Sequence, residues 1–303
     1  MTARPTFRTS DIARAAGVHP NTVRLYESLG YLPPVVRNPR NGYREFTERH
    51  LLHMRLACAA LHVEWWHPAK PMLVRVVLQP AAGELDEAFE TLRAYQATLD
   101  REIAQAELAA EYLERWAEAV SGGAHDAAAV GRETEGPRDE NGFDRDGDAS
   151  RGGGLLEAAM AGVKVDPAGR GPDGENLLIG EAARLLEVST DVLRGWEANR
   201  LLRVPRDPGN GYRRFGPEEI GRARVVRLLR SAGYSPMAVL RMMTAFEAGT
   251  RRGLGEILDT PAEDEDVCTA ADAWLTALGT LKERSREVHR LLSRIAERAR
   301  SGR

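Results

Sequence analysis

The sequence predicts a mainly α-helical chain built from a duplicated module of two short helices and a hairpin. Residues 11–32 match residues 181–202 at a constant offset, and residues 37–46 match 206–215 after one deleted residue. A match that keeps its order through a single deletion indicates duplication rather than the chance likeness of two helices rich in Ala and Arg. Each copy is followed by a long segment with the heptad spacing of a coiled coil.

Length and composition exclude several classes of protein. A chain of 303 residues is long enough for two domains. It has no apolar run of about 18 residues, so we expect no membrane span. The first ten residues lack the apolar core of a signal peptide, which predicts a cytoplasmic protein. Cys58 and Cys268 lie far apart and outside any C-x-x-C pair, so we expect no disulfide framework, no metal site and no cofactor.

The net charge of −3 hides two basic blocks. Residues 1–60 contain nine Arg against four acidic residues, and residues 176–245 contain twelve Arg against seven. The remainder of the chain is acidic. This distribution predicts two separate sites for an anionic partner.

Local signals place two helices in the first copy. Ser10 is a plausible N-cap, and Asp11 in the first turn complements the helix dipole. Gly17 supplies the helix end, and Pro20 suits the first position of the next helix. Two helices joined by a short turn containing Gly form a helix-turn-helix pattern.

A hairpin follows the helix pair. The dipeptide Asn41-Gly42 favours a tight hairpin, in which both central residues take positive φ. A further helix is expected to begin at Thr47. Helix pair and hairpin together predict a winged helix-turn-helix domain.

Two narrow apolar stripes then alternate at spacings of four and three, which is typical of coiled-coil helices. The alternative is a helix that lies on its own domain. The first stripe comprises Leu85, Phe89, Leu92, Gln96, Leu99, Ile103, Ala106, Ala110, Leu113, Ala117 and Val120. The second comprises Ala271, Trp274, Leu278, Leu281, Ser285, Val288, Leu292, Ile295 and Ala299.

The predicted fold class is therefore mainly α, with two winged helix-turn-helix domains, each followed by a long coiled-coil helix, joined by a flexible linker. The linker is expected because residues 121–175 are rich in Gly and charged residues and nearly free of large apolar ones. The expected segments are a first domain at 7–80, a coil at 83–120, the linker at 121–175, a second domain at 176–250 and a second coil at 270–300.

The motifs resemble those of the MerR family of bacterial transcription regulators, which carry V-x-x-x-T-[VL]-R-x-[YW]-E followed by N-G-Y-R-x-F. The first copy has VHPNTVRLYE at 18–27 and NGYREF at 41–46. The second copy has VSTDVLRGWE at 188–197 and NGYRRF at 210–215. It departs from the pattern with Val192 in place of Thr and with Gly195-Trp196 in place of Leu-Tyr. With the trailing helices, the resemblance covers about two thirds of the chain.

The resemblance implies that the second helix of each copy enters the major groove of DNA and that the wing contacts phosphates. Arg pairs bidentately with guanine, Asn pairs with adenine, and Arg also binds phosphate. The positions implied to face the groove are His19, Asn21, Thr22, Arg24, Ser189, Thr190, Asp191 and Arg194. The positions implied to clamp phosphates are Tyr26, Arg37, Tyr43, Arg44, Trp196, Arg206, Tyr212 and Arg213.

Other interpretations stay open for several of these residues. Asp191 repels phosphate unless it accepts a hydrogen bond from cytosine. The second copy therefore either reads a different half-site or binds its half-site less tightly. Tyr26 and Trp196 could belong to the core, and Tyr43 and Tyr212 could merely cover the hairpin. Two histidines, His62 and His67, flank Trp65-Trp66 and could line a ligand pocket, although packing of the tryptophans between helices is the favoured interpretation.

The resemblance further implies promoter DNA as the partner, with RNA polymerase as a second one, and antiparallel pairing of the coiled-coil helices. Pairing within one chain gives a pseudo-dimer, which we favour, and pairing between chains gives a homodimer. No catalytic motif is present, so an enzyme is not expected. The alternatives are a protein-interaction adaptor, which binds a chaperone or a sigma factor, and an excisionase-like protein that bends DNA.

Overall fold

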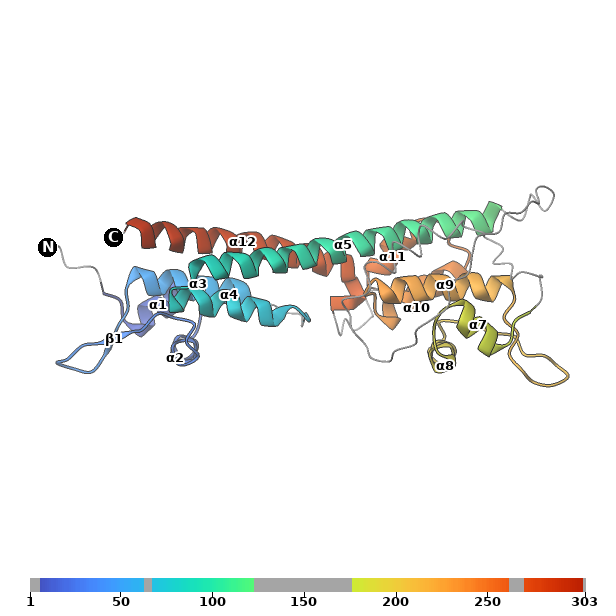
Figure 1. Cartoon of the computed structure of the whole chain (residues 1–303), viewed down its shortest axis with the longest axis horizontal. Helices are drawn as coiled ribbons and strands as arrows, with labels where there is room; N and C mark the ends of the chain where they lie inside the picture. Colours follow the sequence, from blue (N-terminus) through green and yellow to red (C-terminus); the bar gives the residue numbers. More distant parts are fainter. Residues whose placement is uncertain (1–5, 63–66, 123–175, 262–269, 302–303) are drawn as a thin grey trace, which may run out of the picture. The chain divides into compact units, whose positions relative to one another are not determined.

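A computed structural model describes residues 6–62, 67–122, 176–261 and 270–301 of the chain, and it is mainly helical (Figure 1). The chain divides into two compact units, Met1–Arg101 with Thr276–Arg303, and Glu102–Leu275. The predicted linker lies outside the described residues from residue 123 onward, as do Trp65 and Trp66. Among the described helices, none combines the length and the apolar character that crossing a membrane requires.

The first unit opens with the two predicted short helices, α1 (Thr9–Ala16) and α2 (Pro20–Ser28). Gly17 ends α1 with φ of 69°, a left-handed conformation that glycine adopts without strain, and Pro20 is the first residue of α2. The N-cap expected at Ser10 is wrong. The helix begins earlier because the carboxylate of Asp11 accepts the backbone N–H of Arg8 at 2.9 Å, which makes Arg8 the cap.

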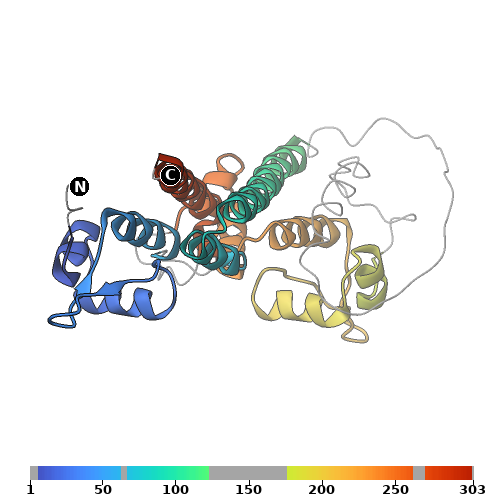
Figure 2. The same ribbon diagram turned by 60° about the vertical axis from the view of Figure 1, so that its left-hand side comes forward.

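A two-stranded wing follows, with β1 (Val36–Arg37) antiparallel to β2 (Arg44–Glu45). Phe7 adds a further bridge, since its backbone exchanges hydrogen bonds of 2.8 and 2.9 Å with Phe46. The wing loop projects from the rest of the module (Figure 2). Phe46 is fully buried, so the bridge attaches the wing to the core of the module.

The tight two-residue turn expected at Asn41-Gly42 is wrong. Four residues separate Asn38 and Tyr43, whose backbones are joined by a hydrogen bond of 2.8 Å, and only Gly42 of the expected pair has positive φ. The side chain of Asn41 instead accepts the N–H of Tyr43 at 3.0 Å. A side-chain turn of this kind stabilises the loop without a left-handed Asn.

Three further helices follow the wing, and the last of them runs from the first unit into the second. They are α3 (Glu48–Leu61), α4 (Lys70–Ala82) and α5 (Leu85–Gly122). Helix α5 ends two residues beyond its expected end and contributes residues to both units. The C-terminal helix α12 (Trp274–Ser301) supplies most of its length to the first unit.

Within the first unit α12 packs antiparallel against α5 (Figure 1). The rings of Phe89 and His289 lie 5.6 Å apart, and Lys282 Nζ lies 2.7 Å from Asp100 Oδ1. Between these two contacts, the amide of Gln96 donates to the hydroxyl of buried Ser285 at 3.3 Å. Residue numbers on α12 fall as those of their partners on α5 rise, so the two helices run antiparallel within this unit.

The buried face of α5 is wider than the narrow stripe that the heptads predict. Leu92 and Leu99 of the stripe are buried, but Tyr95 is buried as well. The reason is that α5 also packs on its own module, where Thr91 Oγ1 donates to Gln79 of α4 at 3.0 Å. Helix α5 therefore packs on its own module as well as on α12. On α12, Ala299 is exposed although the heptads place it in the stripe.

The second unit repeats the module. It contains α7 (Ile179–Leu185), α8 (Thr190–Ala198), α9 (Pro217–Ser231), α10 (Pro236–Glu247), α11 (Leu254–Asp259) and the short η2 (Ala270–Ala273). Its wing forms only isolated bridges, Arg206 with Arg213 and Leu177 with Phe215. The second hairpin is thus more weakly strand-like than the first, although its bridges match those of the first copy.

The second part of α5 and the start of α12 both pack on this module. Trp116 of α5 lies 4.5 Å from the ring of Phe246, measured between centroids. Trp274, the first residue of α12, donates its indole N–H to the carbonyl of Ala232 at 2.8 Å and sits against Gly233. Each compact unit therefore combines one module with residues of both long helices.

Candidate nucleic-acid interface

The exposed face of α2 carries the side chains that the sequence predicts for the groove. Val23 and Tyr26 are buried, which orients the opposite face of the helix outward with Asn21 and Arg24. In the second module Leu193 is buried in the same way, and Asp191 and Arg194 are exposed on α8. Thr22 and Thr190 lie at the margin of this face and are half-buried.

The arginine of this face is held by the residue three positions earlier in both modules. Arg24 donates to Asn21 Oδ1 at 2.9 Å, and Arg194 donates to Asp191 Oδ1 at 2.7 Å. The geometry is shared but the charge is not. Asn21 leaves the positive charge of Arg24 uncompensated, whereas Asp191 forms an ion pair with Arg194.

His19 and Ser189 turn out to be the N-caps of these helices. The Nδ1 atom of His19 accepts the N–H of Asn21 at 3.2 Å, and the hydroxyl of Ser189 accepts the N–H of Val192 at 3.2 Å. Both residues are exposed. They position the start of the helix and still present part of their side chains outward.

The wing tyrosines point into solvent. Tyr43 is 73% exposed and Tyr212 is 64% exposed, so neither covers its hairpin. Arg37 is also exposed and lies on the first strand of the wing, opposite Arg44. Its counterpart Arg206 lies near Glu197, with N and O 3.8 Å apart.

The second wing arginine of each copy forms an ion pair with the glutamate of the helix motif. Arg44 pairs with Glu27, and Arg213 pairs with Glu197 at 2.5 Å. All four side chains are between 20% and 28% exposed. Sequence reasoning placed Arg44 and Arg213 on phosphates and gave no role to Glu27 or Glu197. Both residue types recur at equivalent positions of the two copies, and this recurrence was the signal available in the sequence.

Tyr26 belongs to the core of its module. It is 7% exposed, its ring packs at 5.2 Å from that of Tyr31, and burial raises its pKa to about 12. Trp196 at the same position is half-buried. Tyr26 is therefore a core residue, and little of its surface is open to a ligand.

Sequence reasoning missed one exposed residue. Leu25 is 52% exposed on α2 next to Arg24, and the sequence analysis gave it no role. Helical spacing from the buried Val23 and Tyr26 could have identified it. The second module has Gly195 at this position, so the two outward faces differ in shape as well as in charge.

The histidines near residues 62–67 form no metal site in the described part of the chain, where no cluster of three or more metal-binding side chains occurs. His67 is buried, accepts the N–H of Ala69 through Nδ1 at 3.1 Å and packs its ring near Tyr95. His62 is exposed at the end of α3. The flanking tryptophans lie outside the described residues.

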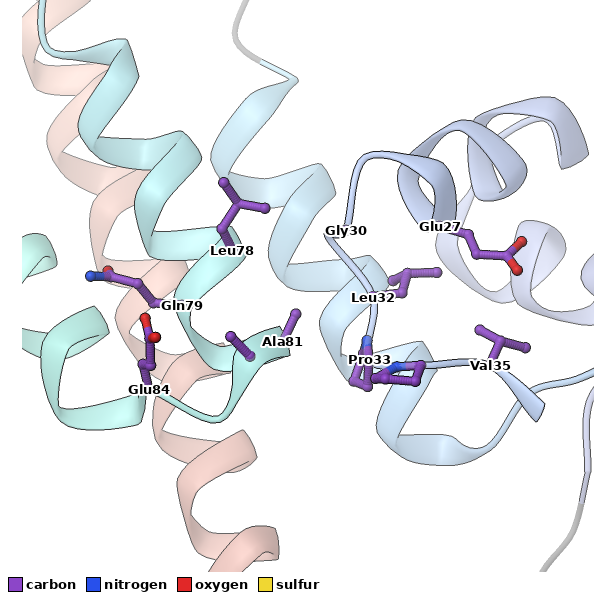
Figure 3. A pocket seen from close by; sticks show the side chains of 11 residues that line it. Glu27, Gly30, Leu32, Pro33, Val35, Leu78, Gln79, Ala81 and Glu84 are labelled. Atoms are coloured by element: carbon purple, nitrogen blue, oxygen red, sulfur yellow. The ribbon is translucent and has the colours of Figure 1, made fainter.

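A shallow hollow of about 460 Å³ lies beside α4, and Figure 3 shows its lining. Leu32, Pro33 and Leu78 form apolar walls, while the polar ends of Gln79 and Glu84 lie on the far side from Glu27. A specific small-molecule site requires polar groups that converge on one point, and the polar groups of this hollow do not.

Comparison with known proteins identifies the two modules. The model of the MerR HTH family of regulatory proteins matches residues 7–64 and 177–245. These ranges coincide with the two repeats and include both outward helices and both wings.

Curated relatives agree with this match. The HTH-type transcriptional regulator CueR of Salmonella typhi is 29% identical over 113 residues, which are 37% of this chain and 80% of the relative. CueR of Escherichia coli O157:H7 is 31% identical over 83 residues, 27% of this chain and 61% of the relative. No solved structure matches the chain significantly.

The resemblance found in the sequence is thereby confirmed. The family consists of transcription regulators and not of enzymes, in agreement with the expectation that the chain catalyses no reaction. Both matched ranges fall on a helix-turn-helix and its wing, and each lies in its own compact unit. Each of the two modules is therefore a module of the MerR HTH family of regulatory proteins, and the chain carries this module twice.

Proposed function

We propose that the chain is a sequence-specific regulator that binds promoter DNA through both winged helix-turn-helix modules. The observation that carries this proposal is the recurrence of one exposed constellation in both copies. Arg24 and Tyr43 of the first module have the counterparts Arg194 and Tyr212, all exposed. Exposed arginine on a helix face and exposed tyrosine on a wing supply base contacts and phosphate contacts, respectively.

The burial and the hydrogen-bond partners of these residues support different roles for them at the DNA. In this proposal Asn21 and Arg24 read bases, with Asp191 and Arg194 as counterparts. His19, Thr22, Ser189 and Thr190 set the start of each helix and contact the backbone or base edges beside it.

On the wings, Tyr43 and Tyr212 contact phosphates together with Arg37 and Arg206. Arg44 and Arg213 approach phosphate while their glutamate partners hold them in place. Tyr26 and Trp196 act chiefly by packing the helix against the module.

We further propose that one chain forms an intramolecular pseudo-dimer. Pairing of α12 with α5 inside the first unit, seen in the contact of Gln96 with Ser285, supports it. The start of α12 also packs on the second module through Trp274. Long helices whose apolar faces are buried within one chain leave less apolar surface for pairing with a second chain. RNA polymerase as a further partner rests on the family alone.

The adaptor and excisionase alternatives find less support. A module that no longer binds DNA has no reason to keep an exposed arginine on the helix face and an exposed tyrosine on the wing. Both copies keep them. An excisionase-like protein has no evident use for two long helices that pair with each other.

The test is selection of bound sites from fragmented genomic DNA with the purified full chain at a stated salt concentration, because salt governs the non-specific background. We expect one enriched site with two unlike half-sites at fixed spacing. The matched control is the double variant Arg24→Ala/Arg194→Ala, which removes exposed side chains and should abolish enrichment. Binding without enrichment of any sequence would contradict the proposal, and a true palindrome would contradict the pseudo-dimer.

A further inference from the structure

The outward face of α2 carries an apolar side chain that the described protein does not cover. Leu25 is 52% exposed, while Val23 and Tyr26 on either side of it in sequence are buried. At about 100° per residue, Leu25 lies about 40° around the helix axis from Asn21. It therefore shares the face from which Asn21 and Arg24 point outward.

The second module provides a natural comparison. Gly195 occupies the position of Leu25, and a Cβ atom built there would meet nothing within 4 Å. The buried side of the helix is alike, since Leu193 is buried as Val23 is, and the Arg194 contact repeats that of Arg24. The outward sides differ, because Val192, 39% exposed, stands where the first module has Thr22. The apolar group at this point of the face is thus specific to the first module.

The major groove offers one apolar group to such a side chain, the methyl group at C5 of a pyrimidine. Arginine and asparagine beside Leu25 recognise polar base edges, whereas a leucine isobutyl group contributes only where an apolar group meets it. Resting on the proposed DNA-binding function, we infer that Leu25 reads a pyrimidine 5-methyl group in the half-site of the first module. The methyl belongs to thymine or to 5-methylcytosine, which present the same group.

The inferred contact makes the two half-sites unequal in a defined way. The first module requires a methyl-bearing pyrimidine at one position, and the second is indifferent there because Gly195 has no side chain. Transfer of one methyl group out of water changes a dissociation constant by about fourfold. This sets the scale of the effect.

The test uses the full chain and the duplex enriched by the selection described above. Each thymine of the duplex is replaced in turn by deoxyuridine, which lacks only the methyl group, and in a second arm each cytosine is replaced by 5-methylcytosine. We expect one thymine, in one half-site, at which deoxyuridine weakens wild-type binding about fourfold. Leu25→Ala should weaken binding to the unmodified duplex and show no further loss with deoxyuridine at that position. A response confined to the second arm assigns the methyl group to 5-methylcytosine.

Two variants serve as controls. Leu108→Ala removes another exposed leucine, on α5, and should keep the methyl sensitivity. Gly195→Leu should create a second methyl-sensitive position in the other half-site. Because Leu25 is exposed, we expect Leu25→Ala to unfold at the wild-type temperature, which circular dichroism checks.

The results separate this inference from the proposed function. If no duplex is enriched, the proposed function fails and the inference falls with it. If the enriched duplex binds wild type and Leu25→Ala with the same methyl sensitivity, or with none in either arm, the inference alone is overturned.

Discussion

Arg44 of the wing forms an ion pair with Glu27 of α2, and Arg213 with Glu197 repeats the pair in the second module. Each pair joins the hairpin to the helix that bears the exposed arginine. Since the four side chains are largely buried, each pair couples the position of the wing to that of the helix.

We predict a coupling free energy of about 1 kcal/mol between Glu27 and Arg44 in a double-mutant cycle with Glu27→Gln and Arg44→Ala. Each single variant should lower the free energy of unfolding, and the double variant should lose less than the sum. Urea unfolding measures all four proteins. The same cycle on Glu197 and Arg213 is the matched control, and strictly additive losses in both would show that the pairs are incidental.

Two positions of the second module keep a backbone conformation that suits glycine. Glu187 has φ of 48° and Arg200 has φ of 61°. They correspond to Gly17 and Gly30 of the first module, whose φ values are 69° and 76°. A side chain in this left-handed region costs about 1–2 kcal/mol.

Arg200→Gly should therefore stabilise the chain by about 1 kcal/mol, because relief of strain outweighs the added entropy of the unfolded glycine. Arg200 is exposed, so little packing is lost. Thermal unfolding measures the gain. Arg200→Ala is the control, because alanine keeps the strain; equal effects of the two substitutions would refute the explanation.

Much of this architecture follows from local sequence signals. Gly17 and Pro20 determine a helix end and a helix start through their own backbone preferences, and the repeated N-G-Y-R marks both wings. Local signals fail where the outcome depends on tertiary contacts. Tyr95 is buried on a second face of α5 because α4 and His67 lie against it, which heptad spacing cannot show.

The same limit applies to the candidate site. Arg24 was found because the family motif contains it, and Asn21 was found because the resemblance implies that its helix enters the groove. The pairing of Glu27 with Arg44 joins residues 17 positions apart, and it requires the wing to fold back on α2. Leu25 was missed because it occupies a position that the family motif leaves unspecified.

The wing of the second module should respond to acid. Asp207 accepts the N–H of Gly209 at 2.9 Å and pairs with Arg214 at 3.0 Å, and these contacts hold its pKa below the usual value of 3.8. A carboxyl whose pKa is depressed by folding stabilises the folded state above its unfolded pKa. That contribution is lost as the pH falls through the lower folded value.

We expect the wild-type chain to exceed Asp207→Asn in stability at neutral pH and to lose this advantage at pH values below about 4. Urea midpoints measured for both proteins between neutral and acidic pH provide the comparison. The first wing has the neutral side chain of Asn38 in this place, so Asn38→Asp supplies a control with Glu45 as its partner in place of an arginine. A constant difference between wild type and Asp207→Asn at all pH values would contradict the assignment.

The two modules should contribute unequally to DNA affinity. Arg24→Ala should weaken specific binding by about 1–3 kcal/mol. Arg194→Ala should cost less, because Asp191 already compensates the charge of Arg194. Asp191→Asn should strengthen binding and steepen the dependence of log K on log salt by about one unit. Asn21→Asp in the first module is the converse control, and equal losses for the two arginine variants would contradict the asymmetry.

The pairing of α12 with α5 predicts a one-chain assembly. The solution mass at low micromolar concentration should be that of a single chain, 33.4 kDa, and the unfolding midpoint should not depend on protein concentration. Leu292 is fully buried on α12, so Leu292→Ala should lower the free energy of unfolding by about 2–5 kcal/mol. Ala299→Ser, at an exposed position of the same heptad series, should have no such effect. A mass of two chains with a midpoint that rises with concentration would show that these helices pair between chains, since only an intermolecular contact gains stability by mass action.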